Sequence, residues 1–209
     1  MKFTINSATF CRMASIPAFF EPGTDPEIQQ QLSCVRLENN KGKVIAIATN
    51  QKIAAIEYLG TTNESDGSVH VTIDPVLINQ LKKEIPFNSF IEVVFVPEIL
   101  TASVKTMLGF SYQGNASVGI PDQSILKNWR TWFPVPSKNS KGAMYWNVDH
   151  INVLAKSSPS GKIIFPENIN TDIPIIIRDV EFAQWVGCFM AKVSPIEQPP
   201  IPATIPEWM

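Results

Sequence analysis

The chain has 209 residues, of which 44% are hydrophobic and 17% charged, with a formal net charge of −2. These values predict a folded globular protein with ample material for a core, and they exclude binding to nucleic acid through overall positive charge. Three distant cysteines without a CxxC pair, no signal peptide and no membrane-spanning run favour a soluble cytoplasmic protein without disulfides or a membrane partner.

A repeated unit begins at the first residues of the chain. A short alternating strand, such as Phe3–Asn6, ends in Asn or Asp and is followed by apolar residues at helical spacing. Asn and Asp accept hydrogen bonds from the free N–H groups of a first helical turn, so each unit predicts a strand and then a helix. The helices are expected to begin near Asn6, Asp74 and Asn147.

Strand-like runs rich in Val, Ile and Phe follow each predicted helix. We expect them at 33–37, 44–49 and 53–59, then at 90–96, 103–112 and 116–119, and finally at 162–165, 173–178 and 185–193. Residues 39–42 predict a hairpin turn. Residues 21–31 and 132–142 are rich in breakers and predict a loop and a linker, and the proline-rich end predicts an extended tail.

The fold class expected from this pattern is α+β, with repeated strand–helix–strands half-domains and a predominantly antiparallel sheet. Residues 1–134 are expected to hold two half-domains, residues 135–193 a third, and residues 194–209 the tail. Three units at near-equal spacing make a chance pattern less probable than a true internal repeat.

Motifs for chemistry are missing from the sequence. His70 and His150 are its two histidines, and neither lies near a cysteine or a cluster of carboxylates at metal-ligand spacing. No P-loop, GxGxxG, GxSxG or HExxH motif occurs. We therefore expect no catalytic residues, no metal, no cofactor and no enzyme activity.

Several segments, in the same order, resemble the bacterial DNA polymerase III beta sliding clamp. They are 44–54, in which Asn50 and Lys52 stand for the family's Asp and Arg, then 69–85, Pro121-Asp122 with 128–134, 146–157 and 173–192. The chain departs from the family in having three half-domains where a bacterial clamp has six, in Ala191 at a usual proline, and in few basic residues on its helices. A shortened form of this kind would suit a phage or another mobile element.

The resemblance implies a clamp-like fold and a protein that tethers a DNA polymerase, or another clamp-motif protein, to double-stranded DNA. Clamp rings carry twelve inner helices, which implies a homo-oligomer of four such chains, paired through edge strands. The implied DNA-facing residues are Arg12, Lys82, Lys83, Lys127, Arg130 and Lys156. The implied peptide-binding pocket is lined by Thr49, Lys52, Ile53, Thr131, Trp132, Cys188 and Met190.

Two other functions fit the same sequence. One is a clamp-like protein-interaction module that does not encircle DNA. The other is a β-rich structural protein of a virion, with the proline-rich tail as an arm. The solution mass and the salt dependence of DNA binding would separate these from a processivity factor.

Overall fold

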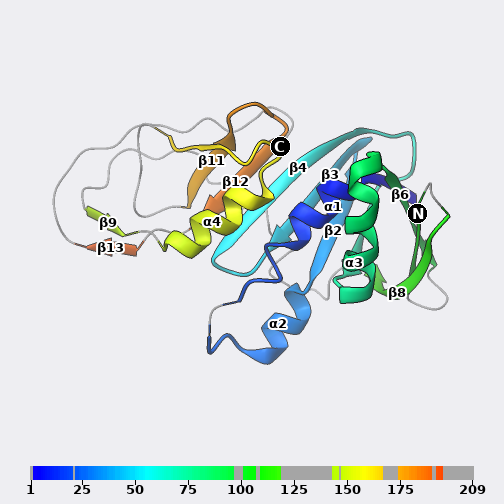
Figure 1. The fold of residues 1–209 in the computed structure, drawn as a ribbon, viewed down its shortest axis with the longest axis horizontal. Helices are drawn as coiled ribbons and strands as arrows, with labels where there is room; N and C mark the ends of the chain where they lie inside the picture. The colour runs from blue at the N-terminus through cyan, green and yellow to red at the C-terminus, as the bar shows by residue number, and fades with distance from the viewer. Residues whose placement is uncertain are drawn as a thin grey trace.

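The computed structural model describes residues 2–20, 22–96, 101–106, 109–118, 143–145, 147–166, 174–189 and 192–194. We describe their helices and strands, drawn in Figure 1, in three consecutive groups that we call half-domains 1 to 3. Half-domain 1 holds β1 (Lys2–Asn6), α1 (Ser7–Ala14), α2 (Pro26–Leu32), β2 (Cys34–Asn40), β3 (Lys43–Thr49) and β4 (Ile53–Thr61). Half-domain 2 holds β5 (Gly67–Thr72), α3 (Pro75–Glu84), the 3-10 turn η1 (Ile85–Phe87), β6 (Phe90–Val96), β7 (Thr101–Thr106) and β8 (Ser111–Val118). Half-domain 3 holds β9 (Ala143–Tyr145), α4 (Val148–Ser157), β10 (Ile163–Ile164), β11 (Ile175–Asp179), β12 (Trp185–Phe189) and β13 (Lys192–Ser194).

The three predicted helix starts are confirmed. The side chain of Asn6 accepts a hydrogen bond from the Ala8 amide at 2.8 Å, and Asp74 accepts one from the Val76 amide at 2.7 Å. Asn147 does the same for α4, with 2.9 Å to the amide of Asp149. Each unit therefore turns from strand to helix at a residue whose short polar side chain satisfies a first-turn donor.

The strands form one antiparallel sheet of eleven strands in the order β1-β6-β7-β8-β5-β2-β3-β4-β12-β11-β10, and β9 pairs with β13 separately. Half-domains 1 and 2 exchange their first strands. β1 of half-domain 1 pairs with β6 of half-domain 2, and β5 of half-domain 2 pairs with β2 of half-domain 1. Half-domain 3 joins the sheet through β12, which pairs with β4. The predicted α+β class with an antiparallel sheet is confirmed.

The sheet has two apolar faces. One face carries Val35, Ile53 and Phe189 and packs against buried residues of α1, α3 and α4, including Phe10 and Leu154. Figure 1 shows these three helices on the same side of the sheet. The opposite face carries a second cluster that includes Ala54 and Cys188 and is covered in part by Phe20, Ile28 and Leu32. Alternation along each strand separates the two sets, since successive side chains point to opposite faces.

Three local predictions need correction. The segment 21–31 was expected to be a loop, but Pro26 occupies the first turn of α2 and Asp25 caps it, so here proline starts a helix. The expected strand 103–112 is divided into β7 and β8 around a turn at Gly109, whose φ of 93° places it in the left-handed region. The expected strand 185–193 ends at Phe189, and β13 belongs to the separate pair with β9.

The turn predicted at 39–42 is confirmed. It joins β2 to β3 through Lys41 and Gly42, whose φ values of 51° and 76° fit the type I′ turns that match the twist of paired strands. The expected linker 132–142, the boundary at residue 134 and most of the tail lie outside the described residues. Within the part of the chain that the structure describes, no helix is long and apolar enough to cross a membrane.

The core of half-domain 3 is built around Trp185 in β12, which is fully buried. Its indole lies over Gly187, where an added β-carbon would stand 2.7 Å from Trp185 Cη2 and 3.1 Å from Leu154 Cδ2. Because Leu154 belongs to α4, the missing side chain at Gly187 lets both the indole and the helix approach the strand closely.

Candidate DNA-facing helices and partner groove

The last turns of the three helices carry the predicted basic residues. Arg12 lies in the last turn of α1, Lys82 and Lys83 in that of α3, and Lys156 in that of α4. The three lysine side chains are exposed. Counted from the capping residue, Lys83 and Lys156 occupy the same position. Cations at a helix C-terminus are also favoured by the helix dipole, so these lysines stabilise their helices whatever else they bind.

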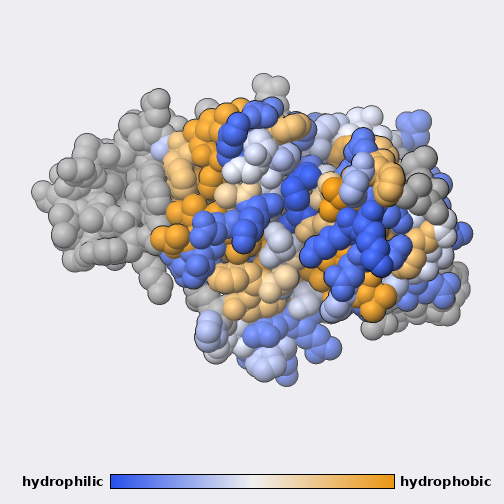
Figure 2. All heavy atoms as spheres, in the orientation of Figure 1, coloured by the Kyte–Doolittle hydropathy of each residue, from blue (hydrophilic) through white to orange (hydrophobic). Residues whose placement is uncertain are grey.

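The helix-bearing face of the molecule has both polar and apolar surface, with Val76 and Val148 exposed at the starts of α3 and α4. Figure 2 shows hydrophilic surface over α3 and along α4. α1 packs beside α3, and α4 packs on β4 and contacts α1. The arrangement therefore presents helices that lie on a rigid sheet and direct exposed lysines to solvent. Lys127 and Arg130, the other predicted DNA-facing residues, lie outside the described residues.

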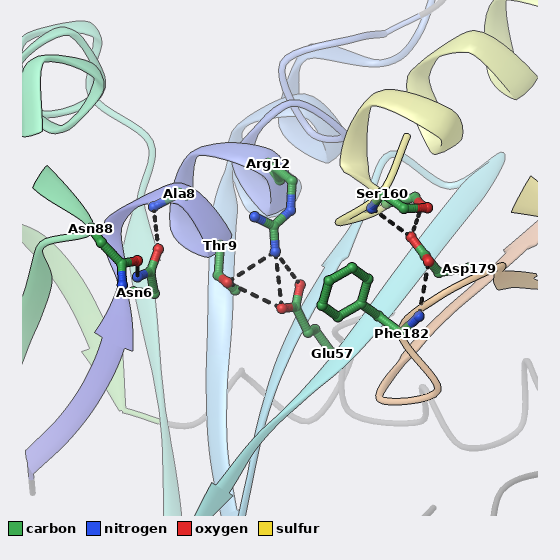
Figure 3. Close-up of polar contacts among 10 residues, drawn as sticks. Asn6, Ala8, Thr9, Arg12, Glu57, Asn88, Ser160, Asp179 and Phe182 are labelled. Atoms are coloured by element: carbon green, nitrogen blue, oxygen red, sulfur yellow. Dashed lines mark hydrogen bonds and ion pairs between the residues drawn. The ribbon is translucent and has the colours of Figure 1, made fainter. Parts of the chain in front are cut away.

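Arg12 differs from the lysines because it is held in a largely buried ion pair (Figure 3). Its Nη2 donates to both carboxylate oxygens of Glu57, at 3.0 and 3.1 Å, and to Thr9 Oγ1 at 3.0 Å. The Thr9 hydroxyl donates to Glu57 Oε1 at 3.1 Å. Burial raises the pKa of Glu57, while Arg12 and Thr9 oppose that rise. The guanidinium thus fastens α1 to β4, and its binding to DNA stays a prediction.

A carboxylate that the sequence did not single out organises half-domain 3. Asp179 is buried and accepts hydrogen bonds from the Ser158 hydroxyl and from the amides of Ser160, Glu181 and Phe182. Figure 3 shows Asp179 between Ser160 and Phe182. Burial alone would raise its pKa, but the donors outweigh burial and lower that pKa to about 2. Asp179 therefore ties the end of α4 to the turn between β11 and β12. An Asp at the start of a turn was a local signal for this role.

The predicted pocket residues that the structure describes gather where the β3–β4 turn meets β12. Asn50 builds this turn, since its Oδ1 accepts from the Lys52 amide at 3.1 Å and from the Ile53 amide at 3.0 Å. In the sheet Thr49 pairs with Ala54, and Ala54 pairs with Cys188. Thr49 and Cys188 therefore lie on one face, two strands apart, and the exposed Lys52 lies at the adjoining turn.

Ile53 does not share that face. It pairs with Phe189, and both belong to the core beneath the helices. Thr49, Ile53 and Cys188 are all buried. The segment leading into α2 reaches the same turn, because Asn50 Nδ2 donates to the carbonyl of Phe19 and Phe20 packs on the cluster that contains Cys188. Thr131, Trp132 and Met190 lie outside the described residues.

The cysteines are thiols without disulfides. Burial raises the pKa of Cys34 and Cys188 to about 12 and that of Cys11 to about 11. They stay protonated at neutral pH and are poor nucleophiles. Among the residues that the structure places, no group of histidine, cysteine or acidic side chains is arranged to hold a metal ion.

No protein-family model and no curated protein sequence matches this chain. Its structure is similar to a DNA polymerase sliding clamp from Pseudomonas aeruginosa crystallised with a ligand, with a TM-score of 0.61, 13% identity, and coverage of 93% of this chain and 66% of that one. It is also similar to DNA polymerase III subunit beta from Borrelia burgdorferi in complex with a natural product, with a TM-score of 0.59, 15% identity, and coverage of 93% and 63%. The chain spans just under two thirds of these proteins. At such identities the likeness establishes architecture, and the chain has the sliding-clamp fold.

Proposed function

We propose that this chain is a subunit of a clamp-like ring that tethers a DNA polymerase to double-stranded DNA, and that it catalyses no reaction itself. The observation that carries the proposal is the placement of α1, α3 and α4 on one face of the sheet, with Lys83 and Lys156 at equivalent positions. A ring of twelve such helices would need four chains. The proposal includes a cytoplasmic location, where DNA replication takes place in bacteria.

The charge pattern suits sliding. DNA phosphates attract lysines regardless of base sequence, and contacts to phosphate alone fix no position along the duplex. A chain with a net charge of −2 would avoid general attraction to nucleic acid and would concentrate its positive charge on the inner helices.

The DNA-binding part of the proposal is tested by replacing Lys82, Lys83 and Lys156 with alanine together. Affinity should fall for all sequences alike, and the slope of log K against log salt should flatten by about one for each lost phosphate contact. A matched control replaces the exposed Lys41, Lys43 and Lys105, which lie away from the three helices. Equal DNA binding by the parent and the first variant would show that these lysines are ordinary surface residues.

Encirclement is tested separately by topology. The protein is incubated with a duplex anchored at one end, and the free end is then blocked with a bulky protein. A ring should resist a high-salt wash only while the end is blocked, because screening removes electrostatic contacts but not a topological link. Wash-off at the same rate with open and blocked ends would exclude encirclement.

The partner groove is proposed at the junction of the β3–β4 turn and β12. Lys52 would hold its polar rim, Thr49 and Cys188 are brought to one face there, and Trp132 and Met190 would supply apolar contacts. A clamp-motif peptide should change Trp132 fluorescence, and Met190→Ala should weaken its binding. If neither is observed, the groove assignment is wrong. Peptide binding by a chain that does not encircle DNA would instead favour the interaction module.

A further inference from the structure

Half-domains 1 and 2 complete each other by a reciprocal exchange of strands. β1, the first strand of half-domain 1, pairs with β6, which follows the helix of half-domain 2. In the same way, β5 of half-domain 2 pairs with β2, which follows the helices of half-domain 1. The exchange buries the helix-facing residues of the receiving strands, since Val35 in β2 and Ile91 in β6 are both fully buried. The helices α1 and α3 then pack side by side.

Half-domain 3 begins with a strand and a helix in the same way, but among the described residues it lacks that completion. β10, its first strand after the helix, has β11 as its one neighbour among the described strands. Its helix-facing residue Ile163 is only partly buried, and Ile164 is 51% exposed. β9 pairs with β13, the strand directly after β12, much as β5 pairs with β8, the last strand of its own half-domain. The other side of β9, which in β5 is taken by β2, has no partner strand among those described.

The open side of β10 carries backbone groups ready for pairing. The Val180 amide donates to the Lys162 carbonyl at 3.1 Å, so the backbone N–H and C=O of Lys162 point toward β11. In an antiparallel ladder these directions alternate, and the N–H and C=O of Ile163 therefore point away from β11. Val35, its counterpart in β2, directs the same groups to β5, because the Ile73 amide donates to Ser33 two residues earlier.

We propose that half-domain 3 is completed by half-domain 3 of a second copy of this chain, with β9 of each copy pairing with β10 of the other across a two-fold axis. By analogy with β5–β2, β10 needs a partner strand equivalent to β9, and β9 needs one equivalent to β10. A second copy of the chain supplies both strands, so we assign the partner as another copy. The pairing covers the open edges of β9 and β10 in both copies and forms a two-fold dimer, in which β1 of each copy remains an end strand. One such dimer contains six half-domains, each with one inner helix. Two dimers would therefore supply the twelve helices of a ring.

The register follows from β5 and β2. Val35 pairs with Val71, which lies three residues before the capping Asp74. The same offset from Asn147 sets Ile163 opposite the partner copy's residue 144, and Ile164 opposite its residue 143. The pair 164–143 is non-hydrogen-bonded, which brings Cα atoms to about 4.5 Å and suits a disulfide.

The test combines Ala143→Cys with Ile164→Cys and oxidises the full-length protein in dilute solution without DNA. Non-reducing gels should show a covalent species of two chains and no longer ladder, while each single variant stays uncrosslinked. The three native cysteines should not form disulfides in this experiment, because their raised pKa values keep the thiols protonated. No dimer, or a ladder of many chains, would overturn the proposal. Thr4→Cys with Ile164→Cys tests the head-to-tail alternative, in which the terminal strands β1 and β10 pair.

A mass measurement provides a second readout. By light scattering the parent should contain an even number of chains, and Ile164→Lys should halve that number by placing charge on the paired edge. Val76→Lys, at a valine that is 64% exposed on α3, makes a similar change away from it and should leave the mass unaltered. A monomeric parent, or an unchanged mass for Ile164→Lys, would refute the pairing. The inference goes beyond the DNA role: a dimer that ignores DNA would contradict only the proposed function.

Discussion

Half-domains 1 and 2 exchange strands with each other, whereas half-domain 3 has no such exchange among the described residues. In the first two, β1 pairs with β6 and β5 pairs with β2, and Val35 and Ile91 are fully buried, while β1 itself ends the described sheet. In the third, Ile163 is only partly buried and β10 ends the sheet. The comparison teaches that the first strand of such a unit can pair with a neighbouring unit and not only with its own, as β1 and β5 do. Stability in half-domains 1 and 2 should come from the exchanged strands and from contacts within each, and in half-domain 3 from its own hydrogen bonds and its packing on β4 and α1.

The largest effect is expected from Arg12→Ala in the completed part. The change leaves the Glu57 carboxylate buried without its cation, which should lower the free energy of unfolding by about 4 kcal/mol. Lys2→Ala is the control, because the Lys2–Glu92 pair is exposed and worth about 0.5 kcal/mol. Urea denaturation measures both. Similar losses in the two variants would mean that Glu57 finds other compensation.

Asp179 tests whether half-domain 3 depends on its own hydrogen bonds. Its folded pKa of about 2 lies below the ordinary value of 3.8, so its contribution is present above pH 4 and is lost as the pH falls toward 2. Asp179→Asn should therefore cost roughly 2 kcal/mol at pH 7 and little near pH 2.

The control for Asp179 is Asp149→Asn in the exposed first turn of α4, where the helix dipole accounts for at most about 1 kcal/mol. Urea titrations of both variants at the two pH values, with hydrogen exchange of α4 and β11 at pH 7, would locate the loss. A deficit for Asp179→Asn that is equal at both pH values would contradict the assigned charge.

A smaller effect is expected from Gly187→Ala, which places a β-carbon 2.7 Å from the buried indole. Overpacking of this kind should cost about 1.5 kcal/mol, seen as a lower midpoint in thermal unfolding. The nearest clash is with Trp185 Cη2, an atom that phenylalanine lacks. Trp185→Phe should therefore destabilise the Gly187→Ala protein less than it destabilises the parent. Additive losses would indicate that the strand, and not the indole, absorbs the strain.

Local signals were enough for the repeat and its helix starts, because a capping Asn or Asp acts on amides two residues away. Local signals gave the wrong element where one residue type occurs in two structural contexts. Pro26 favours a loop by its residue type but starts α2, and the apolar residues around Gly109 favour a continuous strand where the chain turns between β7 and β8.

The candidate site was predictable only in part. The exposure of Lys82, Lys83 and Lys156 follows from helical periodicity. The commitment of Arg12 to Glu57 does not, because the pair joins a helix to a distant strand and depends on sheet order. The same holds for Ile53 and Cys188, which strand alternation places on opposite faces once β4 and β12 are paired.

The open edge of β10 in half-domain 3 relates the amount of assembled protein to the level of expression. If a second copy completes this unit, the amount of finished protein rises with the square of the chain concentration when the chain is scarce. Halving expression would then reduce the assembled form about fourfold, by the mass action that governs a dimer. The amount of assembled protein would then depend more steeply on expression than the amount of chain does, because three units in one chain leave one unit to be completed by a second copy.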